Sequence, residues 1–302
     1  MIADPGQSSQ ERTIVWFRKD LRIQDNPSLF AALENNQRII PVFIWDEEAG
    51  GSWKLGASSR WWLHHALLDL SQSIRNLGGQ LLLLKGKAEE VIPHLANKYG
   101  AKQVYYGRTY DPSGIETQVQ VEEALDQAGI ESQSFNSSLL QEPWETKNGS
   151  GKPFQVFTPY WRKSRQIIYR EPLSYNPSKL NFEVLPTPQT KLDDLELLPH
   201  HPWHHKLGEH WEVTEEAGLR MIRRTVDEVT RSYATRRNPP AVEGTSRLSP
   251  YLAWGLISPR QICQAVLSAE NEGSHRGENK FLVEIGWREF SYHLLYHYPT
   301  IP

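Results

Sequence analysis

The sequence predicts an α/β protein in which a doubly wound, Rossmann-like parallel sheet is followed by an all-helical part. Two observations predict this organisation. Short apolar runs alternate with helical patterns up to residue 135, and only helical patterns remain from residue 213. Between them proline recurs through residues 136–212, which is typical of a long, mostly irregular connection. We therefore expect three parts, at residues 1–135, 136–212 and 213–302.

Five strands are predicted from runs of aliphatic, aromatic and β-branched residues, at 13–17, 38–45, 80–84, 102–106 and 130–135. The helices between them begin at Pro27, Ser58, Ala88 and Pro112. A sheet of this kind binds ligands beyond the carboxyl ends of its strands. No G-x-G-x-x-G follows the first strand, so a standard dinucleotide site is not expected.

The helical part is predicted from apolar residues at helical spacing. One face of its first helix carries Leu219, Ile222, Val226 and Val229. The next helix is expected to include Leu252, Leu256 and Ile257, another opens at Ser258-Pro259, and the last covers residues 281–298.

The composition is that of an ordinary globular protein, with 302 residues, 38% hydrophobic residues and a net charge of −3. A single cysteine, Cys263, excludes an internal disulfide and any multi-cysteine metal site. The His200-His201 and His204-His205 pairs lack neighbouring cysteine or acidic ligands, so no metal site is expected. With no signal peptide and no long apolar run, we expect a cytoplasmic protein without a membrane partner.

Two groups of basic residues leave alternatives open. After the first strand, Arg18, Lys19 and Arg22 could face an anionic ligand, or they could form a structural ion-pair cluster with Asp20 and Asp25. A second group could bind phosphates or form a solvated helix face. It consists of Arg220, Arg223, Arg224, Arg231, Arg236, Arg237 and Arg247.

A run of small hydroxyl residues stands where a helix is expected to begin. Thr245, Ser246 and Ser249 lie near this start, and Gly244 before them allows a close approach of the backbone. Free N–H groups at a helix start favour a phosphate or pyrophosphate. A plain helix cap by serine or threonine is the simpler alternative.

The last predicted helix carries a second group of polar and aromatic residues. Glu284, Trp287 and Arg288 are spaced at i, i+3 and i+4, and Ser291 continues the same face at i+7. A tryptophan between a carboxylate and a guanidinium suits a flat, polar, aromatic ligand. The alternative is a buried aromatic residue beside a surface salt bridge.

Four separated motifs, in order, resemble the photolyase/cryptochrome family, and most closely its cyclobutane pyrimidine dimer photolyases of microbial type. The resemblance extends over residues 13–302. The motifs are Trp16-Phe17-Arg18-Lys19-Asp20-Leu21-Arg22 with Asp25-Asn26, Phe157-Thr158-Pro159-Tyr160-Trp161, Glu243-Gly244-Thr245-Ser246-Arg247-Leu248-Ser249-Pro250, and Trp287-Arg288-Glu289-Phe290.

The resemblance implies an antenna domain, a long connecting loop, and a helical domain that binds FAD and damaged DNA. The matched flavin-binding positions are Tyr233, Thr245, Ser246, Arg247, Leu248 and Ser249, with Phe281 and Arg288 beside them. The matched DNA-facing positions are Arg237, Glu284, Trp287, Arg288 and Ser291. Two of these would be catalytic: Glu284 would hydrogen-bond the dimer and steady its radical anion, and Trp287 would stack on the flipped-out lesion.

The implied activity is light-driven repair, in which excited reduced flavin gives one electron to the dimer, the ring splits and the electron returns. A cryptochrome-type photoreceptor and an antenna-domain protein with a helical remnant are the alternatives. Asp111 is the expected antenna contact, with methenyltetrahydrofolate as first choice of pigment and a deazaflavin close behind. Relatives continue past the last residue here, so we expect a truncated photolyase chain that alone binds FAD weakly or not at all. The full-length protein is expected to be a monomer.

Overall fold

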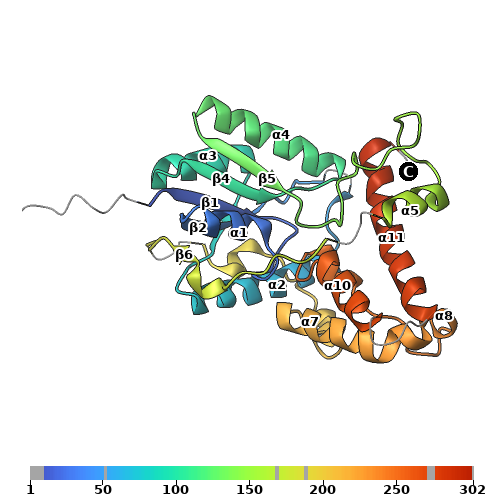
Figure 1. The fold of residues 1–302 in the computed structure, drawn as a ribbon. Coiled ribbons are helices and arrows are strands. Elements are labelled where there is room, and N and C mark those ends of the chain that lie inside the picture. Colours follow the sequence, from blue (N-terminus) through green and yellow to red (C-terminus); the bar gives the residue numbers. More distant parts are fainter. Residues whose placement is uncertain (1–9, 51–52, 167–169, 187–189, 271–275, 301–302) are drawn as a thin grey trace, which may run out of the picture.

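The computed structural model describes residues 10–50, 53–166, 170–186, 190–270 and 276–300. A parallel sheet with helices on both faces lies beside a group of helices, and helix α11 (Arg276–His297) stands at the far side of this group (Figure 1).

The sheet has the doubly wound order β3-β2-β1-β4-β5, with every neighbouring pair parallel. Its strands are β1 (Arg12–Phe17), β2 (Arg38–Trp45), β3 (Leu82–Lys85), β4 (Gln103–Gly107) and β5 (Glu131–Phe135). The predicted parallel five-stranded sheet is confirmed. A short sixth strand, β6 (Asn181–Phe182), pairs with the first two residues of β2. It comes from the proline-rich connection, where two residues are too few to give a strand pattern.

Successive residues of β1 point to opposite faces of the sheet, as strand geometry requires. Val15 and Phe17 pack on one side with α1 (Pro27–Glu34) and α2 (Ala57–Asn76). On the other side Trp16 packs with α3 (Ala88–Tyr99) and α4 (Pro112–Gln127). Figure 1 shows the two pairs of helices above and below the sheet.

The core on the α2 side continues without a break into the helical part. Trp62 of α2 meets Tyr251 of the helical part edge to face, with ring centroids 5.1 Å apart. The helical part contains α7 (Glu215–Arg224), a π-helical turn (Thr225–Val229), α8 (Tyr233–Arg236), α9 (Ser249–Ala253), α10 (Pro259–Glu270) and α11. The connection contributes α5 (Phe157–Ser164), α6 (His205–Gly208) and several single turns.

The expectation that Leu256 and Ile257 belong to a helix with Leu252 is wrong. Helix α9 ends at Ala253, and Gly255 has a φ of 67°, a left-handed conformation that favours glycine. A Cβ at Gly255 would lie 2.1 Å from the carbonyl oxygen of Lys19. The helix stops here because its backbone must pack against the loop after β1, which the local apolar pattern does not report.

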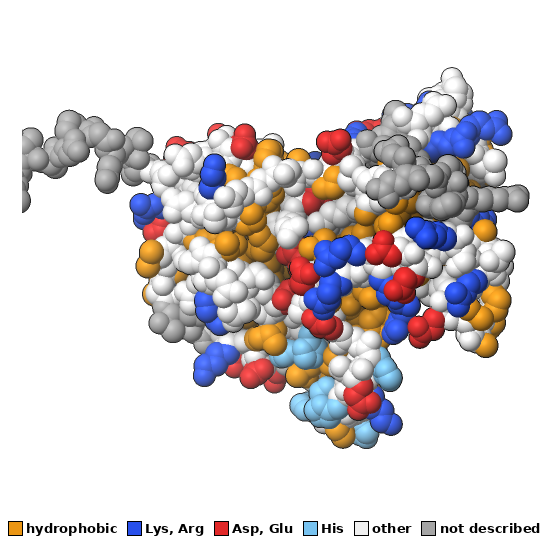
Figure 2. Space-filling view, turned by 60° about the horizontal axis from the view of Figure 1, so that its bottom comes forward, with side chains coloured by type: hydrophobic (Ala, Val, Ile, Leu, Met, Phe, Trp, Pro, Cys, Tyr) orange, Lys and Arg blue, Asp and Glu red, His pale blue; other side chains and the backbone are white. Residues whose placement is uncertain are grey.

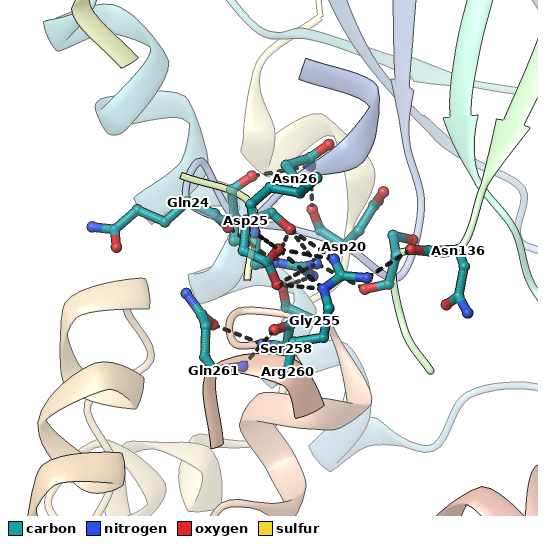
Figure 3. A network of polar contacts seen from close by, with 12 residues as sticks. Asp20, Gln24, Asp25, Asn26, Asn136, Gly255, Ser258, Arg260 and Gln261 are labelled. Carbon is teal, nitrogen blue, oxygen red and sulfur yellow. Dashed lines mark hydrogen bonds and ion pairs between the residues drawn. The ribbon is translucent and has the colours of Figure 1, made fainter. Parts of the chain in front are cut away.

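That loop is fixed by a buried ionic cluster, drawn in Figure 3. The fully buried guanidinium of Arg22 donates to the carbonyl oxygens of Ser137 at 2.7 Å and of Gly255 at 3.0 Å. Arg260 of α10 donates to both carboxylate oxygens of Asp25 at 3.1 Å. The α/β part, the connection and the helical part therefore meet at one cluster. For Arg22, the structural alternative is the one observed.

Within the second group of arginines, the solvated-face alternative is observed for Arg220 and Arg223, whose exposed guanidinium groups are paired with carboxylates. Arg220 pairs with Glu212, and Arg223 pairs with Glu216 at 3.0 Å. Figure 2 shows basic and acidic side chains intermixed over this side of the molecule. Pairs of this kind are exposed and add little stability.

Among the described residues, no helix is both long and apolar enough to cross a membrane. Within the same residues, no three histidine, cysteine or acidic side chains converge in a way that could hold a metal ion.

Arg22→Met should lower the free energy of unfolding by about 3–5 kcal/mol, because it leaves the buried carbonyl oxygens of Ser137 and Gly255 without their donor and removes a buried charge from the cluster. Urea titration followed by circular dichroism measures the change. Arg38→Met, which removes a half-exposed guanidinium that pairs with Glu183, is the control and should change stability by less than about 1 kcal/mol. Equal losses in the two variants would contradict a central role for Arg22.

Candidate functional site

A pocket of about 430 Å³ opens at the carboxyl ends of the strands, where the strand order reverses between β1 and β4. We call it the strand-end pocket. This is the position at which doubly wound sheets bind ligands. Its lining includes aromatic, charged and hydroxyl side chains, among them Trp16, Arg18, Lys19, Trp45, Trp53, Lys54, Arg60, Thr109 and Asp111.

Three buried polar atoms of this lining have no hydrogen-bond partner within the described part of the protein. They are Nη1 of Arg18, Nε of Arg60 and Oγ1 of Thr109. The Arg18 guanidinium lies 4.4 Å from the Trp16 ring centroid, and its Nη2 donates to the Gly114 carbonyl at 3.0 Å. Buried donors are rarely left unpaired, so the pocket suits a flat ligand with an anionic or carbonyl-bearing edge.

Asp111 borders the same pocket, but the protein already uses its carboxylate. One oxygen accepts from Lys19 at 2.9 Å, and the other caps α4 by accepting from the N–H of Gly114 at 3.0 Å. Burial alone would raise the pKa of Asp111, yet Lys19 and these hydrogen bonds hold that pKa below its usual value. Asp111 is thus an ionised residue that fixes Lys19 and the start of α4 beside the pocket.

A second site lies between α8 and α11, and its residues are mostly those expected from the sequence. Tyr233 and Phe281 meet edge to face, with centroids 5.2 Å apart. The Arg237 guanidinium lies 5.6 Å from the Tyr233 ring centroid and forms a salt bridge with Oε1 of Glu284. The sequence did not indicate this Arg237–Glu284 pair, because the two residues are 47 positions apart.

Trp287, one turn beyond Glu284, is 45% exposed. The ring of Phe157, from α5, stacks on its indole with centroids 3.7 Å apart and an interplanar angle of 11°. The residue is therefore neither a buried core aromatic nor a free side chain. It is a partly exposed ring with one stacked neighbour.

The 245–249 segment leads into α9, which begins at Ser249 and is only five residues long. No side chain caps this helix, and the hydroxyls of Thr245 and Ser249 are exposed, with no hydrogen bond to any described residue. Ser246 Oγ is 3.5 Å from the N–H of Leu248, which is buried. The plain-cap alternative thus fails, and the hydroxyls stay available to a ligand.

Gly244, just before this segment, and Arg247, within it, contact protein where the sequence suggested a ligand. A Cβ at Gly244 would lie 2.1 Å from the Arg236 carbonyl, so the close backbone approach is made to α8. Arg247 has a φ of 55°, and its guanidinium lies 4.2 Å from the ring centroid of Trp211.

The expected face of α11 is divided. Glu284 and Trp287 border the site with Arg237, and the Ser291 hydroxyl donates to the Trp287 carbonyl at 2.9 Å. Arg288 lies elsewhere, with its guanidinium 3.0 Å from the Glu289 carboxylate and 4.9 Å from the Tyr292 ring centroid. The expectation of one shared face is therefore wrong for Arg288, because a buried carboxylate attracts it.

Glu289 attaches α11 to the connection. Its carboxylate is buried and accepts from the N–H of Leu140 at 2.8 Å. Burial raises its pKa to about 7, although Arg288 and the backbone N–H oppose that rise.

Sequence reasoning missed Arg60, Trp53 and Phe157 as site residues. The first two are far from Thr109 and Asp111 in the sequence and meet them only at the strand ends. Only a general rule could have indicated the pocket residues: doubly wound sheets bind their ligands beyond the carboxyl ends of the strands. For Arg18, the ligand-facing alternative fits its place in the pocket lining, whereas Arg22 is structural.

The chain is similar to known photolyases and cryptochromes. A family model described as DNA photolyase matches residues 13–178. A deoxyribodipyrimidine photo-lyase of Agrobacterium fabrum is 37% identical over 289 residues, which cover 95% of this chain and 60% of that protein. Cryptochrome-2 of Arabidopsis thaliana is 33% identical over 302 residues, which cover 96% of this chain and 49% of that protein.

A solved structure agrees with these matches. A bacterial class III photolyase from Agrobacterium tumefaciens has a TM-score of 0.90 at 36% identity, and the match covers 98% of this chain and 61% of that chain. The chain thus spans about half to three fifths of the length of these relatives.

Glu289→Gln should flatten the pH dependence of stability. The native state keeps the Glu289 proton to about pH 7, whereas the unfolded chain loses it near 4.5, so the free energy of unfolding falls as the pH rises between these values. The contribution is on the order of 3 kcal/mol. Urea titrations from pH 4.5 to 8 measure it, and Glu215, also raised to about 7, leaves a residual slope in the variant.

The matched control is Glu243→Gln, which removes an exposed carboxylate. It should keep the wild-type slope. If Glu289→Gln also keeps that slope, the carboxyl group is ionised throughout and the pKa assignment is wrong.

Proposed function

Because the chain belongs to the DNA photolyase family, we propose that it forms the antenna part and part of the flavin- and lesion-binding region of a light-driven repair enzyme for cyclobutane pyrimidine dimers. Residues 1–135 are the antenna part, 136–212 the connection, and 213–302 belong to the catalytic part. The observation that carries the proposal is the partly exposed Trp287 beside the Arg237–Glu284 pair.

FAD fits the residues between α8 and the 245–249 segment. The exposed hydroxyls of Thr245 and Ser249 can donate to a pyrophosphate, since no described protein group uses them. Tyr233 and Phe281 supply an apolar wall. When bound, reduced FAD supplies the light-driven electron that opens the cyclobutane ring.

The chain's own residues recognise and hold the lesion. Trp287 offers an aromatic surface for a base that has left the stack, and base–aromatic stacking contributes about 1–3 kcal/mol. Glu284 uses Oε1 for Arg237, and its Oε2 can accept a hydrogen bond from a base edge. Arg237 orients that carboxylate and keeps its charge compensated. Together they favour a flat, hydrogen-bonding ligand over an apolar one.

We propose that the strand-end pocket holds the antenna chromophore. Its unpaired donors on Arg18 and Arg60 suit a carboxylate or carbonyl, and its tryptophans suit a planar ring. Methenyltetrahydrofolate, which has a flat ring system and an anionic tail, is the chromophore we test first. If a deazaflavin binds instead, the strand-end pocket is still the antenna site and only the identity of the pigment changes.

In the flavin-loaded protein, Glu284→Ala should lower the quantum yield of dimer repair roughly tenfold, since it removes a hydrogen bond to a charged state. Flavin content, read from the absorption spectrum, should stay at the wild-type level. Glu243→Ala, an exposed carboxylate that lies 3.6 Å from Arg224, is the matched control. Equal yields in all three proteins would remove Glu284 from the mechanism. No repair by the wild type with flavin intact would favour a photoreceptor.

Arg18→Met should weaken methenyltetrahydrofolate binding about tenfold, because a charged hydrogen bond is lost. Equilibrium dialysis with the purified chain measures the dissociation constant. Arg38→Met, outside the pocket lining, is the control and should bind as the wild type does. A loss of equal size in both variants would place the chromophore elsewhere.

A further inference from the structure

We propose that Phe157, in the connection, is a positioning residue for Trp287. It covers one face of the indole and holds the ring plane fixed, so that the opposite face is ready to stack on a flat base. This inference rests on the proposed function, because the ligand it concerns is an unstacked base of damaged DNA.

The contact between the two rings is close and parallel. Their centroids are 3.7 Å apart with an interplanar angle of 11°, and Phe157 is also parallel to Trp161, at 6.1 Å. Phe290 meets Trp287 edge on at 6.0 Å. Among the described aromatic rings, Phe157 and Phe290 are the two that pair with Trp287. Trp287 remains 45% exposed, and Phe157 is the one described ring that is stacked on it.

The position of Phe157 is set by how α5 seats on α11. A Cβ at Gly286 would lie 2.4 Å from the Trp161 ring, so only a glycine lets that ring reach the α11 backbone. One turn earlier in α5, Phe157 then falls directly over Trp287. Gly286 and Trp161 thus determine the register that aligns the two stacked rings.

Further contacts fix the first half of α5 and the residues just before it. Tyr160 is buried, with its centroid 5.0 Å from that of Phe290 and 5.1 Å from that of His293. The N–H of Phe154, just before α5, donates to Nε2 of His293 at 3.1 Å. A firmly seated helix can hold an exposed indole in one orientation before any ligand arrives.

Fixing a side chain before binding removes an entropic cost from the binding step. An exposed tryptophan without Phe157 would sample several orientations, and stacking on a base would have to select one. The loss should therefore appear in the selectivity for damaged DNA, because phosphate contacts from other residues are common to damaged and undamaged strands.

The first experiment needs no DNA. In ¹⁵N-tryptophan-labelled protein, the indole N–H resonance of Trp287 is identified by its loss in Trp287→Phe. Phe157→Leu should shift this resonance, because a parallel ring at 3.7 Å imposes a ring current that leucine lacks. Thr158→Ala, the next residue of α5 and exposed, is the control and should leave it in place. Unchanged resonances far from α5 show that the variant is folded.

The second experiment measures selectivity. Fluorescence anisotropy gives the dissociation constants of flavin-loaded protein for an oligonucleotide with one thymine dimer and for its undamaged counterpart. Phe157→Leu should reduce their ratio roughly three- to tenfold, the range of an aromatic pair, and Phe157→Tyr should restore it. In a Trp287→Ala background, Phe157→Leu should cause no further loss, because the ring it positions is gone.

The outcomes distinguish a failure of the positioning role of Phe157 from a failure of the proposed function. An unshifted Trp287 resonance in Phe157→Leu, or a ratio equal to wild type, overturns the positioning role and leaves the proposed function standing. An equal further loss in the Trp287→Ala background also overturns it, since Phe157 would then act independently. If the wild type itself fails to prefer the dimer, the proposed function fails, and the lesion-facing role of Phe157 fails with it.

Discussion

The buried pairing of Arg22, Asp25 and Arg260 is the constraint on which the rest of the structure depends. Arg22 and Asp25 come from the loop after β1, and Arg260 comes from the start of α10. Arg22 also holds the connection through the Ser137 carbonyl. Buried charges are tolerated only when fully paired, so this cluster admits one arrangement of the three parts. Asp25 itself has a φ of 51°, a conformation that the pairing maintains.

Both candidate sites follow from that arrangement. The loop held by the cluster begins with Arg18 and Lys19, so its geometry determines the charged edge of the strand-end pocket. The same cluster fixes the start of α10, and α11 is then attached to the connection by Glu289, which accepts from Leu140. The connection is therefore more than a spacer. It pairs with the sheet through β6 and stacks on α11 through Phe157.

Much of the fold could be predicted because strand and helix patterns depend on neighbouring residues. The five strands, and the start of α1 at Pro27, are of this kind. Predictions failed where a distant group decided the outcome. Helix α9 ends early because Gly255 meets the Lys19 carbonyl. Arg288 is drawn to the adjacent Glu289, which is buried where it accepts from the N–H of the distant Leu140. Helical spacing predicts neither the Gly255–Lys19 contact nor the Glu289–Leu140 contact.

By itself the sequence determined the order of the elements, the family, and which residues of the helical part could meet a flat aromatic ligand. Motifs and periodicity are local features, so they can be recognised in the sequence without knowing how the chain packs. Only the tertiary structure decided how those residues are used: Glu284 with Arg237, Trp287 beneath Phe157, and Arg22 in the core. The reason is physical. Burial and charge pairing depend on which surfaces meet, and residues far apart in the sequence supply those surfaces.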